Sequence, residues 1–305
     1  MHAKLRINGV VQGVGFRPFV YRIATQLNLK GYVLNLGNAG VEIEVEGEEY
    51  KIKNFLKLLK EKKPPLAQIK EIQVEWGKEK GYKKFEIRKS KEFSSESISI
   101  IPPDISICDD CINDMERGRR RNYFFTTCTN CGPRFTIIKK LPYDRENTTM
   151  DKFLMCEKCN KEYTNPLDRR YHAQTIACKG CGPQIFLKKD NKIIKEGEEA
   201  IWTACNLLEK GEILAIKGVG GYHLACIVDV AKKLRKILGR KQKPFAIMVK
   251  DIKMAKEIAF INKKEEEMLK SYIKPIILLK KKKEIPQVAP ALHNYGIMLP
   301  YTGLH

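Results

Sequence analysis

The sequence contains no apolar run of about 18 residues, the length at which a segment is expected to cross a membrane as a helix. Its amino terminus also lacks the basic stub and apolar core of a secretion signal, because charged residues such as Lys4 and Arg6 alternate there with strand-forming ones. Both absences argue against export and membrane insertion. We therefore expect a cytoplasmic protein without a membrane partner.

Acidic residues are few relative to basic ones. Lysine and arginine number 57 and aspartate and glutamate 36, which leaves a net charge of +21. Such an excess attracts phosphates or nucleic acid without choosing between them. Solvated lysines on helix surfaces, such as Lys232, Lys233 and Lys236, would produce the same count. The charge fits an anionic substrate, with nucleic acid as an alternative partner.

The 305 residues are enough for two or three domains. We predict a multi-domain α+β protein with a ferredoxin-like domain over residues 1–90, a cysteine-rich region over 102–185 and an α/β domain over 196–305. A polar stretch from Ser90 to Ser99 is the expected linker between the first two. Helix and strand patterns alternate in the third region up to Leu279. No closing strand is expected after that residue, so we predict that the third domain is truncated at its carboxyl-terminal side.

The first region has the element order β-α-β-β-α-β. Leu5 and Ile7 alternate on a first strand, and apolar residues at helical spacing from Phe19 to Leu27 predict a helix. The remaining expected elements are strands over 32–36 and 41–45, a helix around Phe55, and strands over 69–76 and 85–88. This order is that of the ferredoxin-like split β-α-β fold.

A glycine-rich segment, Gly9-Val-Val-Gln-Gly-Val-Gly-Phe-Arg17, joins the first strand to the first helix. Backbone N–H groups at a helix N-terminus bind anions, and the guanidinium of Arg17 could clamp a phosphate or carboxylate there. An ordinary tight loop would have a similar sequence. The candidate residues of this phosphate loop are Gln12, Gly13, Val14, Gly15 and Phe16.

Eight of the ten cysteines form four Cys-x-x-Cys pairs, with 16 residues between the first two pairs and 18 between the last two. Both spacings are typical of zinc ribbons, in which four thiolates saturate a tetrahedral, structural metal. We expect two structural zinc ions, each held within one repeat or, alternatively, by crossed pairs; redox dithiols or disulfides are the other reading. The predicted ligands are Cys108, Cys111, Cys128, Cys131, Cys156, Cys159, Cys178 and Cys181. The apolar surroundings of Cys205 and Cys226 predict buried thiols instead.

A second glycine-rich turn, Lys217-Gly-Val-Gly-Gly-Tyr-His223, follows an apolar strand in the third region. Phosphate could approach the backbone there, although the turn matches neither a Walker loop nor a Rossmann fingerprint. A solvated basic face would look similar. The candidate nucleotide-binding residues are Lys217, Gly218, Gly220, Gly221, Arg240 and Lys243.

The first region resembles the acylphosphatase family through Val11-Gln-Gly-Val-Gly-Phe-Arg17, Gly31-Tyr-Val-Leu-Asn35 and Gly40-Val-Glu-Ile. This resemblance implies that Arg17 binds the phosphate of an acyl phosphate and that Asn35 orients the attacking water. The third region is similar to the YrdC family through the segments from Lys217 to Leu224 and from Lys243 to Ala246. Members of that family make acyl-adenylates from ATP, which implies ATP with Mg²⁺ as a substrate.

The three modules in this order resemble the HypF family of hydrogenase maturation. The most specific segments are Val11 to Arg17, Cys131-Gly-Pro-Arg-Phe-Thr, Asp168-Arg-Arg-Tyr-His-Ala-Gln174 and Lys217 to Leu224. The resemblance implies hydrolysis of carbamoyl phosphate to carbamate and its conversion to carbamoyl-adenylate. It also implies transfer to the C-terminal cysteine of HypE, for the cyanide ligands of the nickel–iron site.

The same resemblance implies an enclosed passage for the labile carbamate, with the zinc region holding two sites in register and His172 or Arg170 lining the passage. Complete transfer is not expected from this chain alone. Two alternatives stay open: an RNA-binding YrdC-like zinc protein, and a simple acylphosphatase with a zinc-stabilised appendage.

Overall fold

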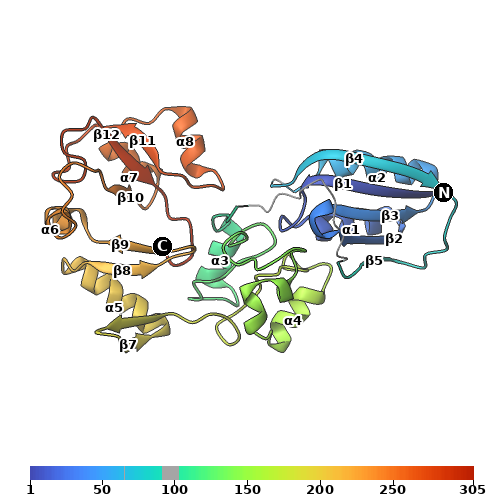
Figure 1. Ribbon diagram of the computed structural model, residues 1–305, viewed down its shortest axis with the longest axis horizontal. Helices are drawn as coiled ribbons and strands as arrows, with labels where there is room; N and C mark the ends of the chain where they lie inside the picture. Colours follow the sequence, from blue (N-terminus) through green and yellow to red (C-terminus); the bar gives the residue numbers. More distant parts are fainter. Residues whose placement is uncertain (65, 91–102) are drawn as a thin grey trace. The chain divides into compact units, whose positions relative to one another are not determined.

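The computed structural model describes residues 1–64, 66–90 and 103–305 (Figure 1). They belong to two compact units, one made of residues 1–104 and 127–182 and the other of 105–126 and 183–305. The expected linker lies outside the described residues, apart from Ser90. No helix in the described ranges is long and apolar enough to span a bilayer.

The first unit begins with a five-stranded sheet of order β4-β1-β3-β2-β5. Neighbouring strands are antiparallel, except that β5 runs parallel to β2. The bounds are β1 (His2–Val10), α1 (Phe16–Gln26), β2 (Lys30–Asn35), η1 (Gly37–Ala39), β3 (Val41–Glu46), α2 (Glu49–Glu61), β4 (Gln68–Gly77) and β5 (Phe85–Ile87) (Figure 1). The ferredoxin-like prediction is confirmed, with β5 as a short edge strand.

The core of this domain lies between the sheet and its two helices. Alternate residues of β1 and β3, such as Leu5 and Ile43, point to one face because side chains alternate along a strand. They meet Val20 of α1 and Phe55 of α2, and all four side chains are fully buried. Burial of each stabilises the fold by about 1.5–3 kcal/mol.

A polar network lies on the face of β3 opposite the core and is centred on the buried carboxylate of Glu44. This carboxylate accepts hydrogen bonds from Lys80 Nζ at 2.7 Å, Tyr82 Oη at 2.6 Å and Tyr32 Oη at 3.0 Å, and it lies 3.0 Å from His2 Nε2. Burial by itself raises the pKa of Glu44, but these bonds outweigh it and lower the pKa to about 2. The carboxylate is therefore charged in the folded domain at neutral pH.

Replacing Glu44 by glutamine is expected to lower the free energy of unfolding by about 3 kcal/mol at pH 7, since the buried donors lose a charged acceptor. A lowered pKa stabilises the fold above the unfolded value near 4.5, and this stability is lost as the pH falls toward 2. The difference between wild type and variant should therefore shrink over that window. Urea unfolding measures it, with exposed Glu71→Gln as the control; a difference independent of pH would contradict the assignment.

The cysteine-rich region contains only short helices among its described residues. They are α3 (Asp109–Arg117), η2 (Arg145–Asn147), η3 (Thr149–Lys152) and α4 (Glu157–Thr164). Both α-helices begin directly after a predicted zinc ligand, Cys108 and Cys156, and each turns a second cysteine toward the first. The weak helix and strand periodicity of this part of the sequence thus reflects a fold that is organised by its Cys-x-x-Cys turns.

The second unit contains a three-stranded sheet of order β10-β12-β11 and two hairpins, β6-β7 and β8-β9. The elements are β6 (Phe186–Lys189), β7 (Lys192–Glu196), α5 (Gly197–Glu209), β8 (Leu214–Lys217), β9 (Tyr222–Ala225), η4 (Val228–Val230), α6 (Ala231–Ile237), β10 (Ala246–Met248), α7 (Ile252–Ile258), α8 (Lys263–Lys270), β11 (Ile277–Lys280) and β12 (Asn294–Met298).

Two sequence expectations were wrong in this unit. First, a strand does follow Leu279. This strand is β12, which lies at the centre of its three-stranded sheet. Gly296 weakens the strand pattern, and a Cβ there would lie 3.0 Å from Ile276 Cγ2, so the close packing favours glycine. Cys205, expected to be buried, is exposed on α5, since that helix turns only part of its apolar surface inward.

Candidate acyl phosphate site and metal centres

The predicted phosphate loop connects β1 to the first turn of α1. Gly13 and Gly15 have φ values of 69° and 73°, a left-handed conformation that favours glycine. A Cβ on Gly15 would also lie 3.2 Å from Thr129 Cβ. The loop therefore leads into the N-terminus of α1, where backbone N–H groups would stabilise an anion.

The structure brings together the two predicted catalytic residues, Arg17 on α1 and Asn35 at the end of β2. Both are buried, with 8% and 0% of their surface exposed. With its amide oxygen assigned toward the guanidinium, Asn35 accepts hydrogen bonds from Arg17 Nε at 3.2 Å and Nη2 at 3.1 Å. A cation and a neutral amide thus lie side by side at the phosphate loop.

Gln12, predicted as part of the loop, has a different role from its neighbours. Its Nε2 donates to the carbonyl oxygens of Gly37 at 2.7 Å and Gly40 at 3.0 Å, and its Oε1 accepts from the backbone N–H of Tyr143 at 3.4 Å. The side chain is therefore occupied in bracing the loop against the turn after β2.

Arg134 is a buried residue of the site whose role sequence reasoning missed, although it belongs to the Cys131-Gly-Pro-Arg-Phe-Thr motif. Its guanidinium donates to the carbonyl oxygens of Gly13, of Cys131 at 2.7 Å and of Thr129 at 2.8 Å. One cation therefore ties a cysteine turn to the phosphate loop. The sequence offered one signal for this role. Arg134 follows the predicted ligand Cys131 by three residues, whereas the corresponding position of the second repeat is Gln184.

A pocket opens beside Arg17. It is lined by the phosphate loop and by segments that include Thr129, Tyr143 and the residues from His172 to Thr175. His172, predicted to line a passage, does border this pocket. Burial and then the charge of Arg17 lower the pKa of His172 to about 4, so its ring is neutral at pH 7. Arg170 instead donates to the backbone oxygen of Thr127 at 2.9 Å.

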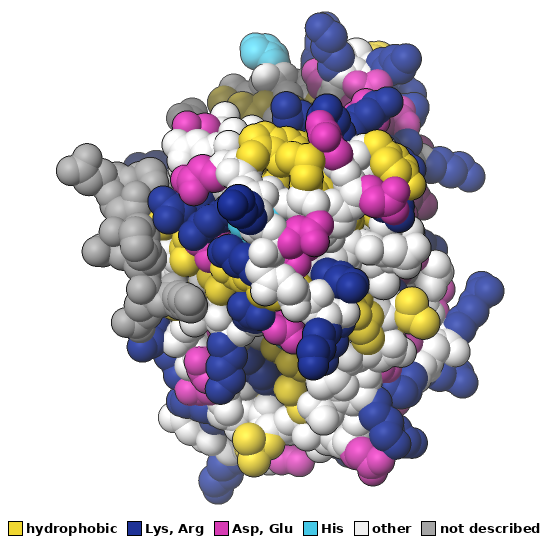
Figure 2. All heavy atoms as spheres, turned by 90° about the vertical axis from the view of Figure 1, so that its right-hand side faces the viewer, with side chains coloured by type: hydrophobic (Ala, Val, Ile, Leu, Met, Phe, Trp, Pro, Cys, Tyr) yellow, Lys and Arg dark blue, Asp and Glu magenta, His cyan; other side chains and the backbone are white. Residues whose placement is uncertain are grey.

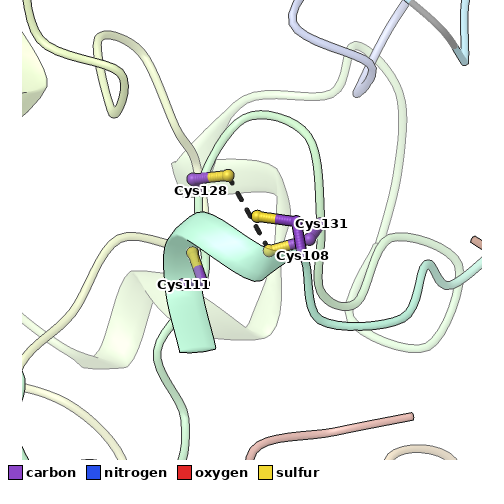
Figure 3. Close-up of side chains that lie close together, drawn as sticks. All are labelled: Cys108, Cys111, Cys128 and Cys131. Atoms are coloured by element: carbon purple, nitrogen blue, oxygen red, sulfur yellow. Dashed lines mark hydrogen bonds between the residues drawn. The ribbon is translucent and has the colours of Figure 1, made fainter. Parts of the chain in front are cut away.

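The eight predicted metal ligands form two clusters, each within its own repeat, so the crossed arrangement is excluded. The sulfurs of each cluster lie within 4.8 Å of one another. In the first, α3 and the turn of residues 128–131 direct four sulfurs toward one another (Figure 3). The two clusters are Cys108, Cys111, Cys128 and Cys131, and Cys156, Cys159, Cys178 and Cys181.

Sulfur spacing shows what these clusters can hold. Adjacent sulfurs are 3.8 Å apart between Cys128 and Cys131, and 3.6–3.8 Å apart around the second cluster. A tetrahedron with zinc–sulfur bonds of about 2.3 Å has edges of roughly 3.8 Å, whereas a disulfide needs about 2.05 Å. The donor sets therefore fit two Zn²⁺ ions, and saturation with sulfur would give each ion a structural role.

Thiolate character in the second cluster agrees with metal binding. Burial raises the pKa of Cys178, but a backbone hydrogen bond from Gly180 and the neighbouring thiols outweigh it and lower the pKa to about 6. In the first cluster, the backbone N–H of Asn130 donates to Cys128 Sγ at 3.3 Å. Such bonds stabilise the charged form that a zinc ion requires.

The nucleotide-binding candidates lie in two loops of the second unit. Lys217, Gly218, Gly220 and Gly221 belong to the β8-β9 hairpin, and Lys217 Nζ lies 4.8 Å from the centre of the Tyr222 ring. Arg240 and Lys243 lie between α6 and β10, where their carbonyl oxygens each accept from Arg235 Nη1 at 3.1 Å. Arg235, which the sequence did not single out, thus shapes the loop that carries them.

An aromatic cluster packs against the first of these loops. Tyr301 Oη and His223 Nε2 are 2.9 Å apart, and the ring of His305 stacks on Tyr301 with centroids 4.5 Å apart. A Cβ on Gly218 would lie 2.9 Å from His223 Nε2, so a larger residue there would displace the His223 ring. Tyr301 and His305 escaped sequence reasoning because no strand was expected to lead to them.

Charge on the surface is mixed on the face that Figure 2 shows, where Lys and Arg side chains lie scattered among Asp and Glu. Examples of close surface pairs in the first domain are Lys53 with Glu49 at 2.7 Å and Arg88 with Glu86 at 2.9 Å. This distribution is typical of a solvated surface.

Comparison with known protein families matches three successive regions of the chain. The acylphosphatase family model matches residues 3–87, and the HypF finger model matches 107–138 and 155–187. A family model described as telomere recombination matches residues 206–305. An acylphosphatase from Thermotoga maritima is 42% identical over 85 residues, which make up 28% of this chain and 93% of that protein.

Other relatives match the whole chain. A probable carbamoyltransferase HypF from Methanocaldococcus jannaschii is 50% identical over 317 residues, covering 100% of this chain and 41% of the relative. The crystal structure of full-length HypF in a phosphate- and nucleotide-bound form matches with a TM-score of 0.93 at 43% identity, covering 100% of this chain and 40% of that one. The chain thus spans about two fifths of the length of these relatives, and it belongs to the HypF family.

Proposed function

We propose that this chain carries the acyl phosphate-hydrolysing part and a nucleotide-binding part of a cytoplasmic carbamoyltransferase. Its first reaction is the hydrolysis of carbamoyl phosphate to carbamate and phosphate. Its second joins carbamate to ATP, supplied with Mg²⁺, as carbamoyl-adenylate with release of pyrophosphate. In the complete pathway the carbamoyl group then passes to the C-terminal cysteine of HypE. The observation that carries this proposal is the buried Arg17–Asn35 pair beside the glycine-rich loop at the N-terminus of α1.

In the hydrolytic step, Arg17 and the backbone N–H groups of the phosphate loop neutralise the phosphoryl oxygens as charge shifts onto the leaving carbamate. Asn35 orients the water that attacks phosphorus, because an amide can hold a water molecule without being consumed. His172 lines the same pocket with a ring that is neutral at pH 7. The two Zn²⁺ ions, held by the two cysteine clusters, stabilise the fold around the site.

Contacts outside the acylphosphatase-like domain favour this proposal over a simple acylphosphatase with an appendage. Arg17 Nη2 donates to the carbonyl oxygen of Tyr143 at 3.1 Å, and Arg134 donates to that of Gly13. Residues of the cysteine-rich region therefore complete the site of the first domain.

The purified, zinc-loaded chain is expected to release phosphate from carbamoyl phosphate, which a colorimetric phosphate assay measures. Acetyl phosphate serves as the matched substrate, since it carries a methyl group where carbamoyl phosphate carries an amino group. We expect the carbamoyl compound to have the higher kcat/KM, because the polar lining of the pocket can accept its N–H groups. A folded, zinc-loaded chain that releases no phosphate would contradict the proposal.

A further inference from the structure

The guanidinium of Arg17 already has an anionic partner within the protein. Its Nη2 donates to Asp144 Oδ1 at 2.7 Å, and its Nη1 donates to Ser90 Oγ at 3.4 Å. Ser90 in turn donates to Asp144 Oδ2, so hydroxyl and carboxylate together cover one edge of the guanidinium. The side chains of Arg17 and Asp144 are 9% and 21% exposed, which leaves this ion pair largely shielded from water.

This edge is the part of Arg17 that remains for a substrate. Nε donates to Asn35, and the two N–H groups of Nη2 are shared among Asn35, the Tyr143 carbonyl oxygen and Asp144. A phosphate that binds the guanidinium in bidentate fashion needs two adjacent N–H donors. Asp144 and Ser90 occupy donors of that kind, and a carboxylate beside a phosphate dianion repels it.

Asp144 is held near Arg17 by a well-anchored segment of the cysteine-rich region. Asp144 is the N-cap residue of η2, and the next residue, Arg145, donates to the carbonyl oxygens of Gln174 at 2.7 Å and Ile176 at 2.9 Å. Asn147 Nδ2 closes the segment by donating to the Pro142 carbonyl oxygen at 2.7 Å. These backbone anchors restrain the segment, whereas the carboxylate is held only by its bonds to Arg17 and Ser90 and can leave them by rotation about its two side-chain bonds.

We propose that Asp144 is an internal competitor of the substrate's phosphate for Arg17. The carboxylate binds the guanidinium in the empty site, an acyl phosphate displaces it, and its return favours the release of inorganic phosphate. A tethered carboxylate competes at a high effective concentration, so weakly binding monoanions are rejected and a phosphate dianion is accepted. The inference rests on the proposed phosphate-binding role of Arg17 but not on carbamoyl phosphate as the substrate.

The test is the affinity of the purified chain for inorganic phosphate, measured by titration calorimetry. Asp144→Asn keeps the shape of the side chain and removes its charge, and we expect it to lower the Kd about tenfold. Asp144→Glu keeps the competing charge and should stay near the wild-type Kd. Asp151→Asn is the matched control, because Asp151 pairs with exposed Lys139 in the same region.

An unchanged or higher Kd in Asp144→Asn would overturn the proposal, and Asp144 would then support the anion site instead. Absence of phosphate binding in both wild type and Asp144→Asn would also overturn it. Carbamoyl phosphate hydrolysis is measured separately on the same samples. Tighter phosphate binding in Asp144→Asn without any hydrolysis would leave the competition standing and remove the proposed function, so the two failures can be told apart.

Discussion

Replacing Arg17 by methionine is expected to lower kcat/KM for carbamoyl phosphate by about a thousandfold or more. The guanidinium is a buried cation beside the predicted phosphate loop, and methionine has a similar length without charge or hydrogen-bond donors. Loss of one preorganised donor from a shielded site costs about a hundred- to a thousandfold, and the loss of a full charge costs at least as much. Phosphate release assays over a range of substrate concentrations measure this change.

Asn35 provides a second variant that separates two roles at the same site. Asn35→Ala is expected to lower kcat much more than it changes KM, because the amide acts on water in the transition state whereas Arg17 also binds the ground state. Arg22→Met is the matched control, since Arg22 is an exposed residue of the same helix. For the first prediction, equal kcat/KM in Arg17→Met and wild type would show that carbamoyl phosphate is hydrolysed at another site.

Replacing one cysteine of either cluster by serine is expected to remove one zinc ion and unfold the turn that it holds. Structural zinc contributes on the order of 10 kcal/mol to small domains with few apolar residues, more than the whole stability of many of them. Wild type should contain two zinc ions per chain, and Cys128→Ser or Cys159→Ser one each. Elemental analysis by mass spectrometry, combined with protection from proteolysis, measures both effects.

The two clusters should differ in their effect on the acyl phosphate site. Arg134 bonds both to the turn of the first cluster and to Gly13, so Cys128→Ser is expected to weaken phosphate binding along with the loss of zinc. Cys205→Ser is the control, because this exposed cysteine lies outside both clusters. Retention of two zinc ions in Cys128→Ser, or full resistance to proteolysis without metal, would contradict a structural role.

Much of the fold could be predicted because its signals are local. The alternation of Leu5 and Ile7 and the helical spacing from Phe19 predicted elements that the structure contains, since both periods are properties of a short segment. The Cys-x-x-Cys spacings likewise predicted two groups of four ligands. β12 was missed because Gly296 interrupts its local pattern, and the close packing of this glycine against Ile276 is a tertiary feature that no local pattern reveals.

The candidate site also combines features that local sequence predicts with features that depend on tertiary packing. By itself, the sequence determined the glycine-rich loop, the candidate pair Arg17 and Asn35 and the two groups of four cysteines, because each depends on residue type and spacing within a short stretch. Only the tertiary structure decided that each cluster forms within its own repeat and that Arg134 braces Gly13. It also decided that Asp144 pairs with Arg17, although the two residues are 127 positions apart in the sequence. Such long-range contacts follow from how separate segments pack, and their energies appear only once the chain has folded.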